Sequence, residues 1–422
     1  MSFHPFDAGS SPPIVFPSIE LITRGGVVDV LICGAGIAGC ALALGLHRVG
    51  IDSRLIEARS SAGPEEGAFL TIAPNGMIAL AALGQPGLVE AARGAAVSGI
   101  EFRNAAGRRI ARLDGTGDRA RYGATSHLVR RGLLREQLLV AVREAGIAVE
   151  HGARVAAVRE TPGEATVVLE DGRELGADVV VGADGIWSQV RASVWPDAPR
   201  PAYGGVIDCG GWVPIDLPDS RAQQMYFGRR AFFGFVVHRG TAYWFSNVPA
   251  PEPARGTLAK IDPAAWLERV RELHADDPAA VRRVLDAATT SLGAWPIYDL
   301  PSLATWQTAR VCLVGDAAHA TNPSAGQGAS LCLEDAVILP RALRDSPNTA
   351  IALANFTNTR RGRVEQIVAM GRRIGTRKAS SAAGSRFRDL SLPLFLRMGA
   401  SATHEQYSYR VDEVDPLAHG VG

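Results

Sequence analysis

Lysine is almost absent from this chain of 422 residues, in which only Lys260 and Lys378 occur. Arginine carries nearly all of the positive charge, and 43 acidic residues balance the 44 basic ones to a net charge of +1. A balanced chain lacks the cationic excess with which proteins hold phosphate backbones. We therefore expect no nucleic-acid partner.

Cysteine is scarce too. The five cysteines form no Cys-x-x-Cys pair and no cluster with histidine, which are the spacings that zinc sites use, so we expect no metal. Their number is odd, and Cys33 and Cys312 lie within apolar runs. This pattern indicates reduced, buried thiols.

Long hydrophobic runs are missing: no 18 consecutive apolar residues occur, which excludes a membrane-spanning helix. The segment up to Gly26 lacks the charged start and apolar stretch of a secretory signal. Pro393 interrupts the apolar stretch Leu390–Met398, which favours a pocket wall or subunit contact over a membrane surface. We expect a soluble cytoplasmic protein, either a monomer or a homodimer.

What the chain does contain begins with a strand, a tight turn, a helix and a second strand. The apolar run Val27–Cys33 leads into Gly-Ala-Gly-Ile-Ala-Gly, which starts at Gly34, and Glu57 ends the second strand. Gly34 permits the turn, Gly36 lets the backbone approach a pyrophosphate, and Gly39 lets the helix pack on the sheet. With an acid placed to accept ribose hydroxyls, the unit predicts a dinucleotide site.

Two other parts of the chain have a clear character. Residues 203–248 are rich in aromatic side chains with period-two alternation, which predicts an antiparallel sheet. Residues 310–343 read as another strand, turn and helix, and the tail 347–374 reads as a helix with Ile367, Val368 and Ile374 on one face. Near the first unit, Asn75 is expected to cap a short helix over residues 77–83.

Separated pieces of nucleotide-type architecture around an aromatic sheet predict an α/β protein, α+β overall. We expect a discontinuous Rossmann-like cofactor domain, an inserted antiparallel-sheet substrate domain and C-terminal helices. The expected segments are 26–82, 126–195 and 305–345 for the cofactor domain, 83–125 and 196–304 for the substrate domain, and 346–422 for the C-terminal region.

Two further motifs indicate which dinucleotide is bound. Gly-Ala-Asp-Gly-Ile-Trp-Ser-Gln-Val-Arg starts at Gly182, and Gly-Asp-Ala-Ala-His starts at Gly315 and continues as Pro-Ser-Ala-Gly-Gln-Gly from Pro323. With the first glycine turn, they resemble the single-component FAD-dependent aromatic hydroxylases, the p-hydroxybenzoate hydroxylase-like flavoprotein monooxygenases. The resemblance spans about residues 27–365.

The resemblance implies roles for individual residues. Glu57 binds the adenosine ribose, Arg131 in an Arg-x-x-Leu pattern lies along the FAD, Asp184 organises the pyrophosphate region and is associated with NAD(P)H, and Asp316 holds the ribityl chain. Pro323 and the glycine-rich backbone after it line the flavin ring. The cofactor-binding residues expected are Gly34, Gly36, Ile37, Ala38, Gly39, Glu57, Ala58, Arg59, Arg131, Asp184, Gly185, Gly315, Asp316, Pro323, Gly326, Gln327, Gly328, Ala329 and Ser330.

The implied chemistry is flavin chemistry. NAD(P)H reduces FAD and departs, O2 adds to give a flavin hydroperoxide, and one oxygen atom hydroxylates or epoxidises an electron-rich substrate. A helix starting near Gly326 aims its N–H groups at the anionic edge of reduced flavin. His319 in the Asp-Ala-Ala-His run is expected to pack locally, because a Ser-His-Asp mechanism has no support in the sequence.

Three alternatives stay open to different degrees. A flavin-dependent halogenase needs an early lysine and Trp-x-Trp-x-Ile-Pro, whereas this chain has no lysine before Lys260 and offers only Trp-Val-Pro-Ile from Trp212. A flavin reductase or dehydrogenase without oxygen insertion, and a non-catalytic flavin-binding protein, share the same motifs. Oxygen uptake with NAD(P)H separates them.

The substrate is the least determined part. Urate-hydroxylating relatives resemble the chain around Tyr203 but carry an arginine where Gly210 stands and an aspartate where Ser324 stands. Losing both charges predicts a neutral, largely apolar aromatic or alkene substrate, of the kind found in natural-product biosynthesis. The candidate pocket residues are Tyr226, Phe235, Asp299 and Pro323, although Asp299 also suits a turn cap.

Overall fold

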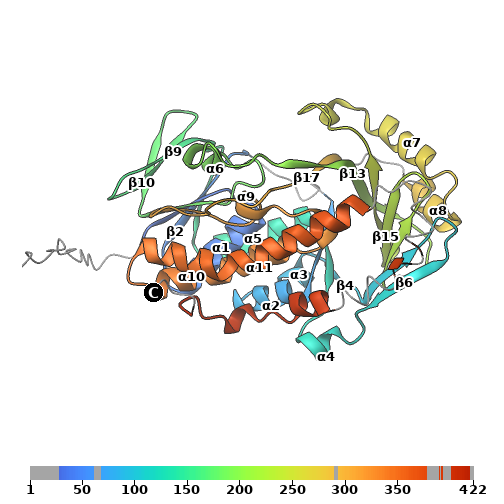
Figure 1. Ribbon diagram of the computed structural model, residues 1–422, viewed down its shortest axis with the longest axis horizontal. Helices are drawn as coiled ribbons and strands as arrows, with labels where there is room; N and C mark the ends of the chain where they lie inside the picture. Colours follow the sequence, from blue (N-terminus) through green and yellow to red (C-terminus); the bar gives the residue numbers. More distant parts are fainter. Residues whose placement is uncertain are drawn as a thin grey trace, which may run out of the picture.

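The computed structural model describes residues 28–60, 68–288, 293–377 and 401–418, together with positions 389, 391 and 392. Val27, the loop 61–67 and most of Leu390–Met398 lie outside the described residues. A parallel sheet with its helices occupies one end of the molecule, and an antiparallel sheet with its own two helices occupies the other (Figure 1). The long helix α11 (Thr349–Arg377) runs along both parts and contacts the antiparallel sheet at β13.

The parallel sheet is assembled from distant segments of the chain. Its strand order is β18-β12-β1-β2-β8, and every neighbouring pair is parallel. All four residues of β1 are fully buried, as expected for a strand covered on both faces. The strands are β1 (Val30–Cys33), β2 (Ser53–Glu57), β8 (Ala148–His151), β12 (Val179–Gly182) and β18 (Val311–Leu313).

Helices α1 and α10 form the centre of the cofactor half. They pack so closely that a Cβ on Gly45 would lie 2.1 Å from the carbonyl oxygen of Ala336. Most residues of α10 are buried, so this helix is a core element rather than a surface one. The helices here are α1 (Ile37–Arg48), α2 (Pro74–Ala82), α3 (Leu88–Ala91), α4 (Asp118–Tyr122), α5 (Arg131–Glu144), α6 (Gln189–Val194), α9 (Asp316–His319) and α10 (Gly328–Asp345).

Small sheets complete this half of the molecule. One has the order β3-β7-β4 and the other β11-β10-β9. Their strands are β3 (Phe69–Ile72), β4 (Ala95–Ala96), β7 (His127–Arg130), β9 (Val155–Glu160), β10 (Ala165–Leu169) and β11 (Glu174–Ala177).

The aromatic region forms the predicted antiparallel sheet, which is larger than the sequence indicated. Its order is β17-β13-β16-β15-β14-β5-β6, and only the β14–β5 pair is parallel. The hairpin β5–β6 comes from a much earlier part of the chain, so the sheet is itself discontinuous. Its strands are β5 (Gly99–Arg103), β6 (Arg109–Asp114), β13 (Ala202–Pro214), β14 (Gln223–Phe227), β15 (Phe232–His238), β16 (Thr241–Pro249) and β17 (Gly293–Asp299).

The two faces of this sheet pack against different partners. On the outer face, Phe233 and Trp244 pack with helices α7 (Pro263–Leu273) and α8 (Ala279–Ala287). On the inner face, Val236 and Tyr243 pack against Phe69 and Leu128 of the small sheet β3-β7-β4. The inner face is therefore the one that looks toward the cofactor half.

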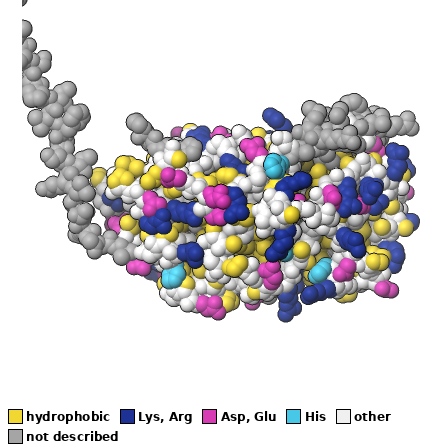
Figure 2. Space-filling view, turned by 90° about the horizontal axis from the view of Figure 1, so that it is seen from below, with side chains coloured by type: hydrophobic (Ala, Val, Ile, Leu, Met, Phe, Trp, Pro, Cys, Tyr) yellow, Lys and Arg dark blue, Asp and Glu magenta, His cyan; other side chains and the backbone are white. Residues whose placement is uncertain are grey.

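The structure confirms the expected fold class and adjusts its edges. Ile374, expected on the apolar face of α11, is 39% exposed, whereas Ile367 and Val368 are buried. The five cysteines are free and buried. Charges of both signs are interspersed over the face in Figure 2, in keeping with the balanced composition. Within the described ranges, no helix is long and apolar enough to cross a membrane, and no group of three potential metal ligands occurs.

Candidate functional site

The first glycine turn brings two distant motifs together. Gly34 has a φ of +112°, and a Cβ there would lie 2.5 Å from the carbonyl oxygen of Ala183 in the second motif. A Cβ on Gly39 would lie 1.9 Å from the carbonyl oxygen of Gly34, so the helix packs directly on the turn. Gly36 has open space in front of it and no side-chain cap. The turn is thus packed against the protein at Gly34 and Gly39 and open at Gly36, where a pyrophosphate can bind.

Glu57 lies at this turn, as its spacing predicts. Its carboxylate is 6% exposed and accepts hydrogen bonds from the backbone N–H of Ala35 at 3.0 Å and from the Arg59 backbone and Nε, both at 3.1 Å. Burial alone would raise the pKa of Glu57, but the hydrogen bonds from Arg59 and Ala35 outweigh it and hold the pKa below its usual value. Glu57 is therefore an ionised acceptor beside the open turn.

The helix after β7 brings an arginine to the glycine turn that the sequence did not single out. Arg131 is exposed at the start of α5, and Arg135, one turn later, donates through Nε to the carbonyl oxygen of Ala35 at 2.9 Å. The Nη2 atom of Arg135 is buried without a hydrogen-bond partner among the described residues and lies at ion-pair distance, 4.0 Å, from a Glu57 oxygen. Helical i, i+4 spacing from Arg131 was the signal that could have identified it.

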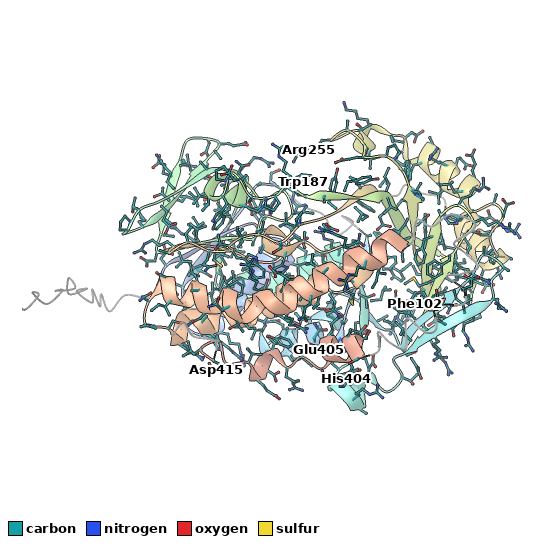
Figure 3. The ribbon with its side chains drawn as sticks, viewed as in Figure 1. Phe102, Trp187, Arg255, His404, Glu405 and Asp415 are labelled. Carbon is teal, nitrogen blue, oxygen red and sulfur yellow. The ribbon has the colours of Figure 1, made fainter. Side chains whose placement is uncertain are left out.

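The second motif forms a compact turn on which α6 begins. Asp184 accepts hydrogen bonds from the backbone N–H groups of Gln189 at 2.7 Å and Val190 at 3.1 Å. Its other oxygen is buried without a partner in the described structure. Burial raises the pKa of Asp184 despite these bonds. Trp187 is 46% exposed, and the Arg255 guanidinium lies 5.1 Å from its ring centroid (Figure 3).

The third motif is a sharp turn between β18 and α9. A Cβ on Gly315 would lie 2.9 Å from the Cβ of Ala38, so this turn packs on the first motif. Asp316 is exposed, although the residues on both sides of it are buried. His319 is buried with its Nε2 2.7 Å from an oxygen of Asp335. The Asp316 side chain can therefore face a ligand, whereas the His319 side chain is bound within the protein interior.

The loop after Asn322 leads into the longest helix of the cofactor core. Pro323 begins the 3₁₀ turn η2 (Pro323–Ala325), and Gly326 follows with a φ of +62° and open space beside it. Helix α10 begins at Gly328, with Gln327 as a cap that makes no side-chain cap bond. Its free N–H groups therefore point at the space in front, in line with the expected helix near Gly326.

One residue near this loop differs from expectation. Asn75 does not cap α2, because the cap is Ala73, and its side chain turns inward to Gln327 and Glu334. Ser330, predicted to be a cofactor position, has a fully buried side chain that accepts a hydrogen bond from the backbone N–H of Ala73 at 3.2 Å. Ile37, Ala38, Ala58, Arg59, Gly185, Gly328 and Ala329 lie in the turns and helix starts just described.

The candidate pocket residues divide. Tyr226 and Phe235 stack on each other, with ring centroids 6.0 Å apart, in the core between the sheet and α7–α8, so they face away from the cofactor half. Asp299 is buried and ion-paired with Arg372 of α11. Pro323 is exposed in the loop before α10. Alternation along a strand separates two faces but does not say which one meets the ligand.

A Ser-His-Asp chain is present, although no sequence pattern predicted it. His274 Nε2 lies 2.8 Å from the Ser246 hydroxyl, and His274 Nδ1 lies 2.6 Å from Asp277. Ser246 and His274 are fully buried between the sheet and α7, and Asp277 is 4% exposed. A serine nucleophile must be accessible to its substrate. This buried Ser-His-Asp series therefore has a structural role and is not a hydrolytic site.

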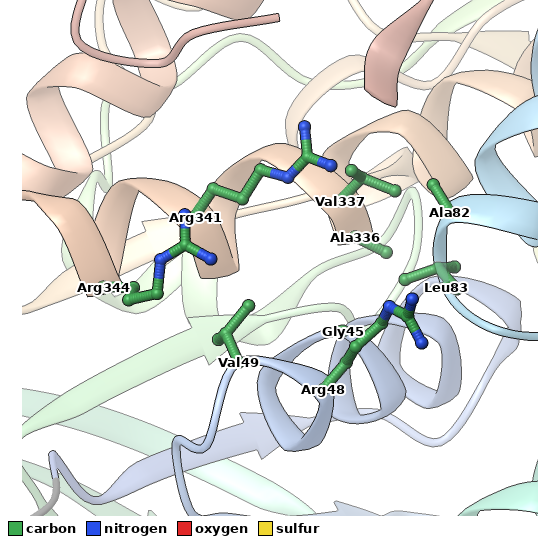
Figure 4. A pocket seen from close by; sticks show the side chains of 9 residues that line it. All are labelled: Gly45, Arg48, Val49, Ala82, Leu83, Ala336, Val337, Arg341 and Arg344. Atoms are coloured by element: carbon green, nitrogen blue, oxygen red, sulfur yellow. The ribbon is translucent and has the colours of Figure 1, made fainter. Parts of the chain in front are cut away.

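Cavities are present in two further places of the described structure. One of about 120 Å³, between α1, α2 and α10, is rimmed by Arg48, Arg341 and Arg344, whose guanidinium groups do not converge on one point (Figure 4). The other, of about 360 Å³, lies between residues 194–199 and residues 303–305 and reaches the last residue of the second motif, Arg191. The first cavity is not lined by residues of the three glycine motifs.

The residues of the site fit an FAD molecule. The open faces at Gly36 and Gly326 leave room for pyrophosphate and ring, and the exposed Asp316 lies between them in the chain. Buried polar atoms without a hydrogen-bond partner in the described structure lie on Arg135, which contacts the first turn, and on Asp184 of the second motif. The fold and this site define a dinucleotide-binding flavoprotein with a separate substrate sheet.

Comparison with known proteins gives the family. The family described as "FAD binding domain" matches residues 27–370, and the chain belongs to it. Aurachin C monooxygenase/isomerase of Stigmatella aurantiaca is 33% identical over 353 residues, covering 82% of this chain and 89% of that protein. The 2-heptyl-3-hydroxy-4(1H)-quinolone synthase of Pseudomonas aeruginosa is 33% identical over 355 residues, covering 81% and 87%.

A solved structure agrees with the sequence relatives. Klebsiella pneumoniae HpxO complexed with FAD and uric acid superposes with a TM-score of 0.79 at 25% identity, covering 91% of this chain and 96% of that one. The chain is an FAD-dependent monooxygenase, and NAD(P)H is the reductant typical of its family.

Proposed function

We propose that this enzyme uses FAD, NAD(P)H and O2 to oxygenate a neutral, largely apolar aromatic or alkene substrate held against the inner face of the antiparallel sheet. Bound FAD would supply the oxygen-transfer chemistry. The residues of the chain would bind and orient the substrate and exclude water from it. The aromatic lining of the inner face is the observation that carries the proposal.

That lining is continuous across several strands. Phe69 of β3 contacts Tyr243 and Phe245 of β16 edge-on, each at a centroid distance of 6.0 Å. Phe245 in turn lies 6.0 Å from Phe232, beside Met225. A flat apolar ring buried here gains about 25 cal/mol per Å² of apolar surface removed from water.

The structure around Gly210 and Ser324 agrees with the loss of the two charges of the urate-type pattern. A Cβ on Gly210 would lie 2.5 Å from the carbonyl oxygen of Trp244, so no side chain fits at this position without a shift of the strands. Ser324 offers only a hydroxyl in η2. An anionic substrate would lack its counter-charge at both positions, and a buried unpaired charge costs several kcal/mol.

Two arginines near this face already have contacts within the protein. Arg130 stacks on Trp212 with its guanidinium 3.8 Å from the ring centroid, and Arg372 is paired with Asp299. Asp208, on the same face as Trp212, accepts a hydrogen bond from Asn247 at 2.8 Å. A carboxylate on this face disfavours an anionic substrate further.

The relatives are in keeping with this proposal. One is named for aurachin C and another for a quinolone that carries a heptyl chain. HpxO, solved with uric acid, represents the polar alternative. For this chain we propose a substrate of the apolar kind, such as an indole, phenol, quinolone or polycyclic intermediate.

The test compares matched pairs of compounds, each a neutral aromatic and its carboxylate. We expect the neutral member to stimulate NAD(P)H oxidation coupled to product more strongly, by about tenfold or more in kcat/KM. A kcat/KM that is about tenfold or more higher for the carboxylates than for the neutral compounds would contradict the proposal. Stimulated NAD(P)H oxidation without any oxygenated product would favour a reductase instead.

A further inference from the structure

Three fully buried charged residues lie directly behind the proposed flavin loop. Glu334 and Asp335 are neighbours on α10, and Arg360 comes from α11. The Arg360 guanidinium reaches Glu334 at 2.6 Å, Asp335 at 2.8 Å and the Leu331 carbonyl oxygen at 3.2 Å. A planar guanidinium with several donors can fix two carboxylates in one geometry, which an ammonium group cannot do.

Asp335 continues from this centre to the Gly-Asp motif. One of its oxygens accepts the backbone N–H of Gly315 at 2.9 Å and lies 2.7 Å from Nε2 of His319. These contacts hold both ends of the short helix α9, which carries Asp316. Asp335 therefore determines where Asp316 stands. We call this set the first arm.

Glu334 continues from the same centre to the loop before α10. It accepts a hydrogen bond from the Asn75 amide at 2.7 Å, and the same Nδ2 donates to the Gln327 side chain at 3.0 Å. Gln327 is the residue on which α10 begins, and Arg363 also pairs with Glu334 at 2.8 Å. Glu334 thus determines, through Asn75, where the N–H groups of α10 point. We call this set the second arm.

We propose that Arg360, Glu334 and Asp335 form a positioning centre that holds the two arms of the FAD site in register. This deepens the proposed function, because it concerns how the same site places its cofactor. None of the three residues faces the open side of the site, so they act through Asp316 and Gln327. They are positioning residues and not catalytic ones.

Energetics favours positioning over plain stabilisation. A buried ion pair loses so much hydration that apolar residues of similar volume often serve stability equally well. Burial alone would raise the pKa of Glu334, but Arg360, Arg363 and Asn75 outweigh it and lower the pKa. His319 and Arg360 likewise hold the pKa of Asp335 well below its usual value against the effect of burial. Both carboxylates are therefore permanently charged near neutral pH, and the arms keep one geometry.

The experiment separates the arms with four variants. Asp335→Asn removes the charge of the first arm, Asn75→Ala cuts the second arm, and Arg360→Lys keeps the central charge but loses the fork. Arg361→Met is the matched control, because Arg361 makes a comparable set of bonds from the same helix, to the carbonyls of Leu303 and Ala304 and to Glu365. The readouts, taken without substrate, are FAD affinity, the visible spectrum of bound FAD and the melting temperature. The rate of H2O2 release during NAD(P)H oxidation without substrate is a further readout.

Each arm has its own expected result. Asp335→Asn should raise the Kd for FAD by about tenfold or more, the scale of a lost charge-assisted hydrogen bond. Asn75→Ala should change the Kd by less than about threefold but alter the flavin spectrum and raise the rate of substrate-independent H2O2 release by about threefold or more. Arg360→Lys should show both defects, and Arg361→Met should show neither.

Two outcomes would overturn the proposal. One is that Asp335→Asn and Asn75→Ala lower the melting temperature but leave FAD affinity, spectrum and H2O2 release like those of Arg361→Met. The other is that both variants show the same defect, since then no separate arms exist. If Asp335→Asn does not fold, Asn75→Ala and Arg360→Lys decide alone. These readouts need no substrate, so an error in the proposed substrate class would not affect them.

Discussion

Glu57 shows how much a single carboxylate contributes at the glycine turn. It ties the turn to Arg59 through one oxygen and to the Ala35 N–H through the other, and on that second oxygen a lone pair remains for a ribose hydroxyl. Because these donors keep it ionised, its hydrogen bonds to a ribose are charge-assisted ones.

We predict that Glu57→Ala weakens FAD binding by about 1–3 kcal/mol. The reason is the loss of a charged acceptor together with a looser turn at Ala35. Titration of the FAD-free variant by flavin fluorescence measures the change, and Glu144→Ala, at an exposed end of α5, is the control. Unchanged affinity in a folded Glu57→Ala variant would show that Glu57 is not the ribose acceptor.

The buried Ser246–His274–Asp277 chain leads to a second prediction. Asp277→Ala should lower the free energy of unfolding by about 1–3 kcal/mol, because it leaves His274 buried without its partner. Denaturant unfolding measures this loss, and Asp276→Ala at the exposed neighbouring position is the control. Ser246 should not react with a fluorophosphonate probe in the folded protein, and labelling would contradict the structural role.

At the scale of single residues, the sequence showed the motifs that are contiguous. Gly34, Glu57 and Asp316 are recognisable because neighbouring residues set their geometry. Asn75 was predicted as a helix cap, and Arg360 was not identified, because their partners Gln327 and Glu334 lie far from them in the chain or on another helix, and only the folded structure brings them together. Local pattern carries no information about such pairs.

At the scale of elements, α11 packs close to the flavin loop at two glycines. A Cβ on Gly371 would lie 2.9 Å from the Thr321 hydroxyl and 3.0 Å from the Cβ of Ala325, and a Cβ on Gly375 would lie 2.7 Å from the Asn322 amide. The helix therefore forms a wall directly behind the loop 321–326. Side chains at these glycines would displace the loop.

We predict that Gly371→Ala weakens FAD binding, by about tenfold if the loop must shift. A Cβ on Gly362 of the same helix would meet nothing within 4 Å, so Gly362→Ala is a matched control. That control should instead raise stability by up to about 1 kcal/mol, the difference in helix propensity. FAD titration and thermal unfolding measure the affinity and the stability of both variants. Equal FAD affinity and equal stability of the two would argue against close packing of α11 behind the loop 321–326.

The sequence could not show on which face of the antiparallel sheet each aromatic residue lies. Alternating aromatics indicated the antiparallel sheet, yet Tyr226 and Phe235 belong to its outer face, which α7 and α8 cover. Phe245 and Tyr243 belong to the inner face. The period of two is the same for both faces, and only the order of packing partners distinguishes them.

For the whole molecule, the buried network predicts a dependence of stability on acid. The pKa values of Glu334 and Asp335 lie below their ordinary ones in the folded state, so the unfolded chain takes up protons first as the pH falls. Their contribution is therefore complete above the ordinary carboxyl pKa of about 4 and is lost as the pH falls below it.

Arg360→Met tests this contribution. Its deficit in unfolding free energy relative to the native protein should be largest near pH 7 and should narrow as the pH falls below about 5, because the denatured carboxylates of the native chain then become protonated. Urea unfolding at several pH values measures it, and Arg361→Met should show a deficit that varies less with pH. A deficit for Arg360→Met that does not change with pH would contradict this account.

The burial of all five cysteines has a consequence for the resistance of the protein to oxidation. A flavin enzyme that releases H2O2 is exposed to its own oxidant, and only the thiolate form of cysteine reacts readily with it. Burial raises the pKa of Cys40 and of Cys209 to about 12 and also raises those of Cys33, Cys312 and Cys332. We expect no thiol to react with Ellman's reagent until the protein unfolds, and prolonged turnover with H2O2 release should leave all five reduced. The protein would then age through its methionines and not through its cysteines.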